Sequence, residues 1–303
     1  MQQFPMRAVV VPAVLALCTT AAAADPVRGS VFVDLRLHVG DTEQDEVAHY
    51  GLSPSIILGG SIVLGRGFEI AASLAAAKLS ASWENIGGLA NGLLELQRTV
   101  RGRSWRAMVS AGLAFPLDRS LPAPECFEPD RGPGDSLVLS YGTSTACWDR
   151  SAYRRAALHR GAWDIWMWAP DWVSVPVTAR FEGTGSRNAF YAIDAGVAIA
   201  MPVTAAHDDP AVILQIAPEV GVHLSPRWLA GVRAIAAGVV LDRTSPFMVS
   251  LEPYAEYAHA AVRVRFSLLL PLADLRNEDV SPGLGGYQPI ELYSLGVQAG
   301  VLF

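Results

Sequence analysis

Residues 30–39 read SVFVDLRLHV, and apolar and polar side chains alternate along the whole segment. One face carries Val31, Val33, Leu35, Leu37 and Val39. The other face carries Ser30, Phe32, Asp34, Arg36 and His38. A period of two is the geometry of a β-strand, in which successive side chains point to opposite faces. The segment therefore predicts a strand with one apolar face.

The same alternation recurs in eleven further segments, each of about ten residues or a little more. These segments are 52–64, 68–80, 88–100, 105–117, 172–182, 189–201, 211–224, 228–241, 247–258, 261–272 and 290–303. Their length suits a tilted strand that crosses a membrane and exceeds that of the usual globular strand. Together with the first segment they predict twelve strands.

The connections between these segments are of two alternating kinds. The short ones are 65–67, 101–104, 183–188, 225–227 and 259–260. The alternate ones are mostly longer and polar: 40–50, 81–87, 118–171, 202–210, 242–246 and 273–289. An even number of strands with short turns on one rim and long loops on the other is typical of outer-membrane barrels. We therefore predict an all-β, antiparallel transmembrane barrel of about twelve strands, with ten to fourteen as the range. The short turns and both termini are expected on the periplasmic side.

The composition agrees with this fold. The chain has 303 residues, of which 51% are hydrophobic and 17% charged, with a mean hydropathy of +0.28. So much apolar surface excludes a disordered chain, and a net charge of −6 without a basic run argues against nucleic-acid binding. Beyond the N-terminus no apolar run reaches the roughly 18 residues that a membrane helix needs. Apolar residues at every second position of the predicted strands explain why the chain is so hydrophobic and yet has no long apolar run.

The strands of a soluble β-sandwich or β-barrel also alternate between apolar and polar side chains. The composition of the polar face therefore has to distinguish a soluble fold from a membrane barrel. In residues 69–77 that face carries mostly small residues: Glu69, Ala71, Ser73, Ala75 and Ala77. A soluble sheet turns charged residues outward, so small residues favour the membrane barrel. Pro176, Pro218 and Pro253 argue against it, because a closed barrel has no edge strand where a missing donor is harmless.

The N-terminus predicts export. Residues 1–24 contain one basic residue (Arg7), an apolar stretch over 8–17 and three alanines before Asp25, which fits a secretory signal peptide. A lipoprotein signal ending at Cys18 is the alternative. The expected organisation is a signal peptide over 1–24 and one barrel domain over 25–303, with a long extracellular loop at about 118–171.

Export leaves two cysteines in that loop. Cys126 and Cys147 are expected to form a disulfide, since the compartment is oxidising and no residues at metal-ligand spacing flank them. The carboxylates of 41–46 match no calcium-loop pattern and predict a solvated turn. We expect no metal and no cofactor.

The last eleven residues, YSLGVQAGVLF, alternate again and end on an aromatic residue, with Tyr293 and Phe303 at the two ends of the apolar face. This stretch resembles the C-terminal signal by which Gram-negative outer-membrane barrels are recognised for assembly. The resemblance implies location in the cell outer membrane, with outer-membrane lipid, lipopolysaccharide and the barrel assembly machinery as partners.

If the apolar face meets lipid, the face turned inward carries charges of both signs in the second half of the chain. The candidate lumen-lining residues are Arg180, Asp194, Gln215, Glu219, His223, Arg233, Glu252, Tyr254, Glu256, Arg263 and Arg265. The short turns predict Glu219 opposite Arg233, Glu256 opposite Arg263 and Tyr254 opposite Arg265. Arg180 and Asp194 are expected to face inward without lying directly opposite each other.

Two interpretations of these charges stay open. They form internal ion pairs that fill or rigidify the lumen, or they create a transverse field in a pore that orients small polar or charged solutes.

The long loop also holds Trp163, Trp166, Trp168 and Trp172. Tryptophan prefers the membrane interface, which favours an outer aromatic girdle. A constriction folded into the mouth, or an aromatic platform for a sugar, is the alternative.

These features favour a passive pore for small solutes over a barrel with a closed, salt-bridged lumen that serves a structural or surface-interaction role. An outer-membrane lipid hydrolase ranks third, although twelve strands resemble the outer-membrane phospholipase as well as small sugar-acid porins. His223 and Ser225 lie on the short-turn side, and His159 near Ser151 has no evident third catalytic partner. We therefore expect no enzymatic activity.

Overall fold

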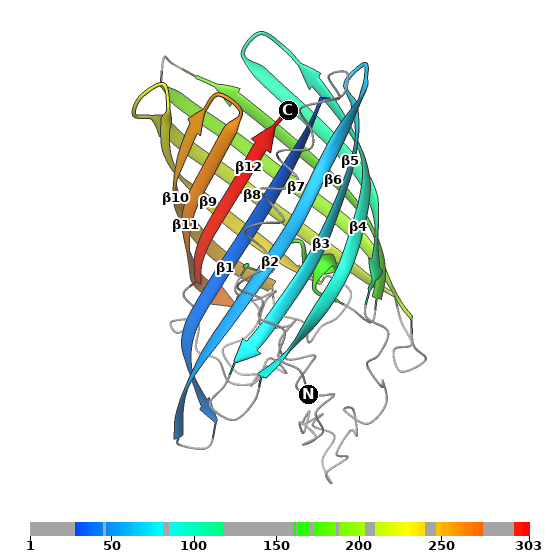
Figure 1. Ribbon diagram of the computed structural model, residues 1–303, viewed down its shortest axis with the longest axis vertical. Helices are drawn as coiled ribbons and strands as arrows, with labels where there is room; N and C mark the ends of the chain where they lie inside the picture. The colour runs from blue at the N-terminus through cyan, green and yellow to red at the C-terminus, as the bar shows by residue number, and fades with distance from the viewer. Residues whose placement is uncertain are drawn as a thin grey trace.

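Twelve antiparallel strands close into a barrel in the computed structural model (Figure 1). The structure describes residues 28–44, 47–80, 85–117, 160–161, 163–169, 172–185, 188–203, 210–239, 247–274 and 294–303. The signal peptide, Cys126, Cys147 and Tyr293 lie outside these residues. Among the described residues, no helix has the length and apolar character needed to cross a membrane.

The strands follow one another around the ring, and the last pairs with the first. In chain order they are β1 (Gly29–Gln44), β2 (Val47–Gly65), β3 (Phe68–Ser80), β4 (Asn85–Arg101), β5 (Trp105–Pro116), β6 (Trp172–Thr184), β7 (Ala189–Pro202), β8 (Ala211–His223), β9 (Trp228–Val239), β10 (Phe247–His259), β11 (Val262–Asp274) and β12 (Ser294–Leu302). Each contains or closely matches a predicted segment, so the predicted fold class and strand count are confirmed.

Alternation along the strands separates an apolar outer wall from a polar or small-residue inner wall. Leu96 and Val109 are about half exposed on the outside, whereas their neighbours on the inner face include the buried Ser110. The short turns gather at the upper rim of Figure 1, where the C-terminus also lies. There the ring closes through Gly29, whose N–H donates to the carbonyl of Phe303, 2.9 Å away.

The three mid-strand prolines fit the closed barrel through local gaps in the ladder. Each proline keeps a Cα partner on one neighbouring strand. On the other side the pairing is interrupted, between β5 and β6 at Pro176, between β8 and β9 at Pro218 and between β10 and β11 at Pro253. The missing N–H donor of each proline therefore falls where no ladder bond is made.

Two predicted registers are wrong. Arg180 lies directly opposite Asp194, and Glu256 lies opposite Arg265 rather than Arg263. In the second case the turn is Ala260-Ala261, one residue later than expected, and Ala260 adopts the left-handed φ of 52° that such a tight turn needs. A one-residue shift of the turn moves every pair on the hairpin by two, so Arg263 faces Ala258 and Tyr254 faces Ser267.

Candidate functional site: the barrel lumen

A segment of the long loop is folded into the barrel. Trp166 and Met167 are each 1% exposed, and together with Trp168 they pack against small side chains on the inner faces of β3, β5 and β7. These small residues are Ala75, Ala77, Ala114, Ala198 and Ala200. Alanine on the inner wall leaves the space that the indole rings fill. We call residues 160–161 and 163–169 the inserted segment.

The expected outer girdle of tryptophans is therefore wrong. Trp163, Trp166 and Trp168 lie within the barrel, and Trp172 begins β6 and packs on the same buried cluster. Trp166 and Trp168 are buried because small side chains on the inner wall leave room for their rings, whose apolar surface is removed from water there.

Aromatic residues do gather on the outer wall, but at the rim of the short turns. The rings of Trp105 and Phe181 stack with centroids 6.0 Å apart, and Phe181 lies 6.3 Å from Tyr191. Trp228 and Tyr257 form a second pair at 5.1 Å. Exposed aromatic rings near one rim are typical of the level at which a membrane barrel meets the interface.

Asn91 on β4 is the main backbone anchor of the inserted segment. Its side-chain amide donates to the carbonyls of Trp166 at 2.7 Å, Ala169 at 2.8 Å and Trp172 at 3.2 Å. Asn91 is fully buried. The two N–H donors of this amide are therefore shared among three carbonyls, of which that of Ala169 also accepts from the Trp172 N–H at 3.0 Å.

Arg160 anchors the other end of the segment. Its guanidinium donates to Asp34 Oδ2 at 3.0 Å, to the Asp34 carbonyl at 3.2 Å and to Ser55 Oγ at 3.2 Å. It also lies 5.0 Å from the centre of the Trp168 ring. Burial lowers the pKa of Arg160, while the charge of Asp34 opposes that shift. The guanidinium keeps its proton, since its usual pKa is far above neutral.

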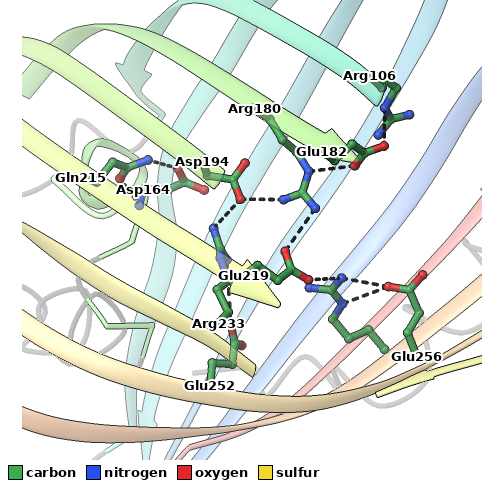
Figure 2. A network of polar contacts seen from close by, with 11 residues as sticks. Arg106, Asp164, Arg180, Glu182, Asp194, Gln215, Glu219, Arg233, Glu252 and Glu256 are labelled. Atoms are coloured by element: carbon green, nitrogen blue, oxygen red, sulfur yellow. Dashed lines mark hydrogen bonds and ion pairs between the residues drawn. The ribbon is translucent and has the colours of Figure 1, made fainter. Parts of the chain in front are cut away.

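The middle of the segment contacts β8 and β9. The Asp164 N–H donates to Gln215 Oε1 at 2.9 Å, and Gln215 Nε2 donates to Asp164 Oδ1 at 3.2 Å (Figure 2). The Arg233 guanidinium lies 4.2 Å from the centre of the Trp163 ring, which is cation–π geometry. The segment is thus attached to β1, β2, β4, β8 and β9.

Burial raises the pKa of Asp164 to about 6, and the charge of Glu95 adds to that rise. The Gln215 hydrogen bond, Arg233 and Arg160 act in the opposite direction. The pKa of an aspartate is ordinarily near 4. Asp164 therefore takes up a proton in the docked segment at a pH where a free aspartate stays ionised.

We expect the inserted segment to be held more weakly above pH 6 than below it. A carboxyl group with a raised pKa binds its proton more tightly in the docked state, so docking is stabilised as the pH falls from about 6 toward 4. That stabilisation is lost as the pH rises through 6. The fraction of tryptophan fluorescence that a neutral quencher reaches in the purified barrel should increase with a midpoint near pH 6, because docking is weaker above that pH, while the contacts of Asn91 and Arg160 keep the segment docked at pH 7.

Asp164→Asn is the matched control for this titration. Asparagine can keep both hydrogen bonds to Gln215 but carries no titrating group. A midpoint near pH 6 that persists in this variant would assign the transition to another group and contradict the prediction.

Among the described residues, twelve charged side chains form one continuous network of ion pairs across the lumen. Figure 2 shows the part of this network around Arg180, Glu219 and Arg233. Its cations are Arg36, Arg106, Arg160, Arg180, Arg233 and Arg265. Its anions are Asp34, Glu182, Asp194, Glu219, Glu252 and Glu256. Six positive charges meet six negative ones, so the network is neutral.

Glu219 is a junction in this network. Its two oxygens accept from Arg180 Nη2 and Arg265 Nη2, each at 3.1 Å, and the residue is 1% exposed. Arg180 continues to Asp194 at 2.5 Å, and Arg265 continues to Glu256 at 2.9 Å. The junction ties β6, β7, β8, β10 and β11 together through side chains.

The other candidate residues from the sequence are placed as follows. Glu252 contacts both Arg233 and Arg36, and the Arg265 guanidinium lies 4.0 Å from the centre of the buried Tyr254 ring. The predicted opposition of Glu219 and Arg233 is present in the register. His223 is exposed at the short-turn end of β8, apart from the network.

Sequence reasoning missed several residues of the site. Asp34, Arg36, Asn91, Glu95 and Arg160 all contribute to the lumen. Asp34 and Arg36 lie on the polar face of the first predicted strand, and that position was sufficient to predict that they line the lumen. Asn91 is an amide within an apolar and glycine-rich stretch of β4, and such a residue in a buried wall needs partners.

The lumen is not filled. A cavity of about 460 Å³ reaches Arg106 and Arg263 near the short turns, and a second of about 220 Å³ lies against Arg160 and Met167. They share part of their walls, including Trp163 and Asp164 of the inserted segment. The inserted segment thus lies against both polar spaces. In the described residues, no group of three or more His, Cys, Asp or Glu side chains could hold a metal ion.

Known structures share this architecture. An outer membrane channel of Pseudomonas putida F1, COG4313, superimposes with a TM-score of 0.58 at 10% identity, over 93% of this chain and 97% of that one. The fold is that of an outer-membrane β-barrel. The NanC porin (TM-score 0.46, 8% identity, 89% of this chain and 98% of that one) and the NalP translocator domain from Neisseria meningitidis (0.44, 10%, 96% and 94%) are more distant. No family model and no curated protein matches the sequence.

Proposed function

We propose that this barrel is a passive outer-membrane channel for small polar solutes. The observation that carries the proposal is the cavity of about 460 Å³ inside the barrel, which is lined by charged, amide and hydroxyl side chains. Polar lining is what a water-filled path through a membrane barrel requires, whereas a purely structural barrel can be packed with side chains.

The arrangement of charge supports transport of polar rather than apolar solutes. Two carboxyl groups, of Glu95 and Asp164, and two guanidiniums, of Arg233 and Arg265, line both cavities. A field between carboxylates and guanidiniums orients a polar solute as it passes. The neutral ion-pair network argues against strong selectivity for either anions or cations.

Location in the outer membrane fits the apolar outer wall and the aromatic rings at the short-turn rim. The lipid and lipopolysaccharide of that membrane would surround the barrel, and Phe303 at the end of β12 would be read by the assembly machinery. The proposal assigns the lumen to passage of solutes and no catalytic step to any residue.

A second candidate function is a structural barrel with a closed lumen. The buried inserted segment and the self-neutralised network favour it, because both fill or brace the interior. The two functions differ in whether ions can cross.

Single-channel recording in a planar lipid bilayer distinguishes them. The purified full-length barrel in KCl should give discrete conductance steps, with anions and cations contributing comparably to the reversal potential under a salt gradient. A complete lack of steps at every voltage and pH, for wild-type protein and for variants with a released segment, would exclude the channel and favour the structural barrel.

A further inference from the structure

Charges that line the cavities fall into two groups. Eleven belong to the neutral network, in which each charge has a partner, whereas its twelfth member, Glu219, contacts Arg180 and Arg265 but lines neither cavity. Outside it, the described chain places three charged or titratable side chains on the cavity walls: Glu95, Asp164 and Arg263. Asp164 is engaged by Gln215. Glu95 and Arg263 both line the larger cavity and have no ion-pair partner among the described residues.

Glu95 is oriented by a chain of hydroxyl groups. The Ser110 hydroxyl donates to Glu95 Oε1 at 2.7 Å, and the Thr178 hydroxyl lies 2.7 Å from Ser110 Oγ. Because the single Ser110 proton goes to Glu95, Thr178 is the donor in the second bond. Gln97 approaches Oε2 at 3.4 Å. These contacts hold the carboxylate from the wall and leave its remaining acceptor sites for a donor in the cavity.

Arg263 is a guanidinium that has no side-chain acceptor among the described residues. On β11 it lies opposite Ala258 of β10 and Gly300 of β12, and neither residue offers a side-chain oxygen. The side chain is exposed at the end of the cavity near the short turns. A guanidinium binds a carboxylate or a phosphate with two parallel hydrogen bonds, and the carboxylate is the smaller of these two ligands.

The two groups stand on well-separated walls of the same cavity. β4 and β11 are five strands apart around the ring of twelve, which is nearly opposite. A cavity of about 460 Å³ lies within the range of small-molecule sites. A carboxylate on one wall and a guanidinium on the other complement a solute that carries both a cation and an anion.

We propose that the larger cavity binds a small zwitterion, with the ammonium group of the solute at Glu95 and its carboxylate at Arg263. This inference rests on the proposed channel function and names the solute class for it. A singly charged solute satisfies one of the two groups and leaves the other unpaired.

Binding to the purified barrel in detergent tests the proposal without requiring conductance. The probes are γ-aminobutyrate, butyrate and butylammonium at pH 7, which share a four-carbon chain and differ in their charged ends. Ligand-observed NMR titration gives the three dissociation constants. We expect γ-aminobutyrate to bind about tenfold more tightly than either singly charged probe, as one charge-assisted hydrogen-bonded contact provides.

Two variants give opposite signatures. Glu95→Gln should weaken γ-aminobutyrate binding to the level of butyrate, and Arg263→Gln should weaken it to the level of butylammonium. Arg227→Gln, at the exposed turn between β8 and β9, is the matched control and should change nothing. Equal binding of the three probes to the wild type, or equal losses for every probe in either variant, would overturn the proposal.

The same probes separate this proposal from the channel function. Binding of the zwitterion by a barrel that gives no conductance steps would refute the channel and retain the site. Steps together with probe-independent binding would refute the zwitterion site and retain the channel.

Discussion

Replacing Asn91 with aspartate is expected to release the inserted segment and to raise the single-channel conductance. The carboxylate has the shape of the amide but no donor, so it faces the carbonyls of Trp166, Ala169 and Trp172 with a negative charge. Each buried carbonyl that loses its donor costs about 1–3 kcal/mol. A total of about 3 kcal/mol shifts the ratio of docked to released segment by roughly 100-fold.

The conductance step should increase because the space filled by Trp166 and Met167 becomes part of the path. Tryptophan emission should shift to longer wavelength in the same sample. Asn188→Asp makes the same chemical change at an exposed position on the short-turn rim and serves as the control. A wild-type conductance step in Asn91→Asp, together with red-shifted emission, would show that the released segment does not limit the pore.

The fold could be predicted because every strand obeys one simple rule. Lipid outside and polar or small residues inside impose a period of two on all twelve strands, and glycine or short polar turns mark where each hairpin reverses. The inner faces of β8, β9 and β10 were therefore predicted with their charges, including Glu219, Arg233 and Glu252.

The registers were harder to predict because they depend on which residues make each turn. Between β10 and β11 the turn residues are alanines, without the glycine or asparagine that usually marks a left-handed position. A turn shifted by one residue gave Arg263 the wrong partner, and the structure instead leaves Arg263 opposite Ala258. The consequence is functional, since Arg263 is then available to a solute.

The inserted segment could not be predicted for a different reason. Its tryptophans do not show the alternation of a strand, so their spacing does not say whether they face lipid or the lumen. An indole is also equally suited to a membrane interface and to a buried cluster. Residues far away in sequence determine that the segment lies inside the barrel. Alanines on β3, β5 and β7 leave room for the rings, and Asn91 and Asp34 supply hydrogen-bond partners for the segment. Long-range contacts of this kind are not written in the segment itself.

The second large effect concerns the stability of the barrel. Glu219→Gln should lower the free energy of unfolding by about 3–5 kcal/mol, the cost of removing one partner from a buried ion pair. Glutamine keeps one acceptor oxygen, so either Arg180 or Arg265 faces an amide NH2 donor in place of a carboxylate oxygen, and the network keeps six cations with five anions. Urea unfolding in lipid vesicles measures the loss. Glu95→Gln removes a carboxylate that has no ion pair and should leave the stability nearly unchanged.

A second substitution separates lost charge balance from lost packing. In the double variant Glu219→Gln with Arg180→Gln every remaining charge keeps a partner: Arg265 has Glu256, Arg233 has Asp194 and Arg106 has Glu182. If unpaired guanidiniums cause the loss, the double variant is more stable than the sum of the two single losses implies, because each single substitution leaves an opposite charge in excess. Strictly additive losses would mean that Glu219 acts through packing alone. In that case each residue of the network would contribute to stability independently, and the balance of charge across the network would add nothing.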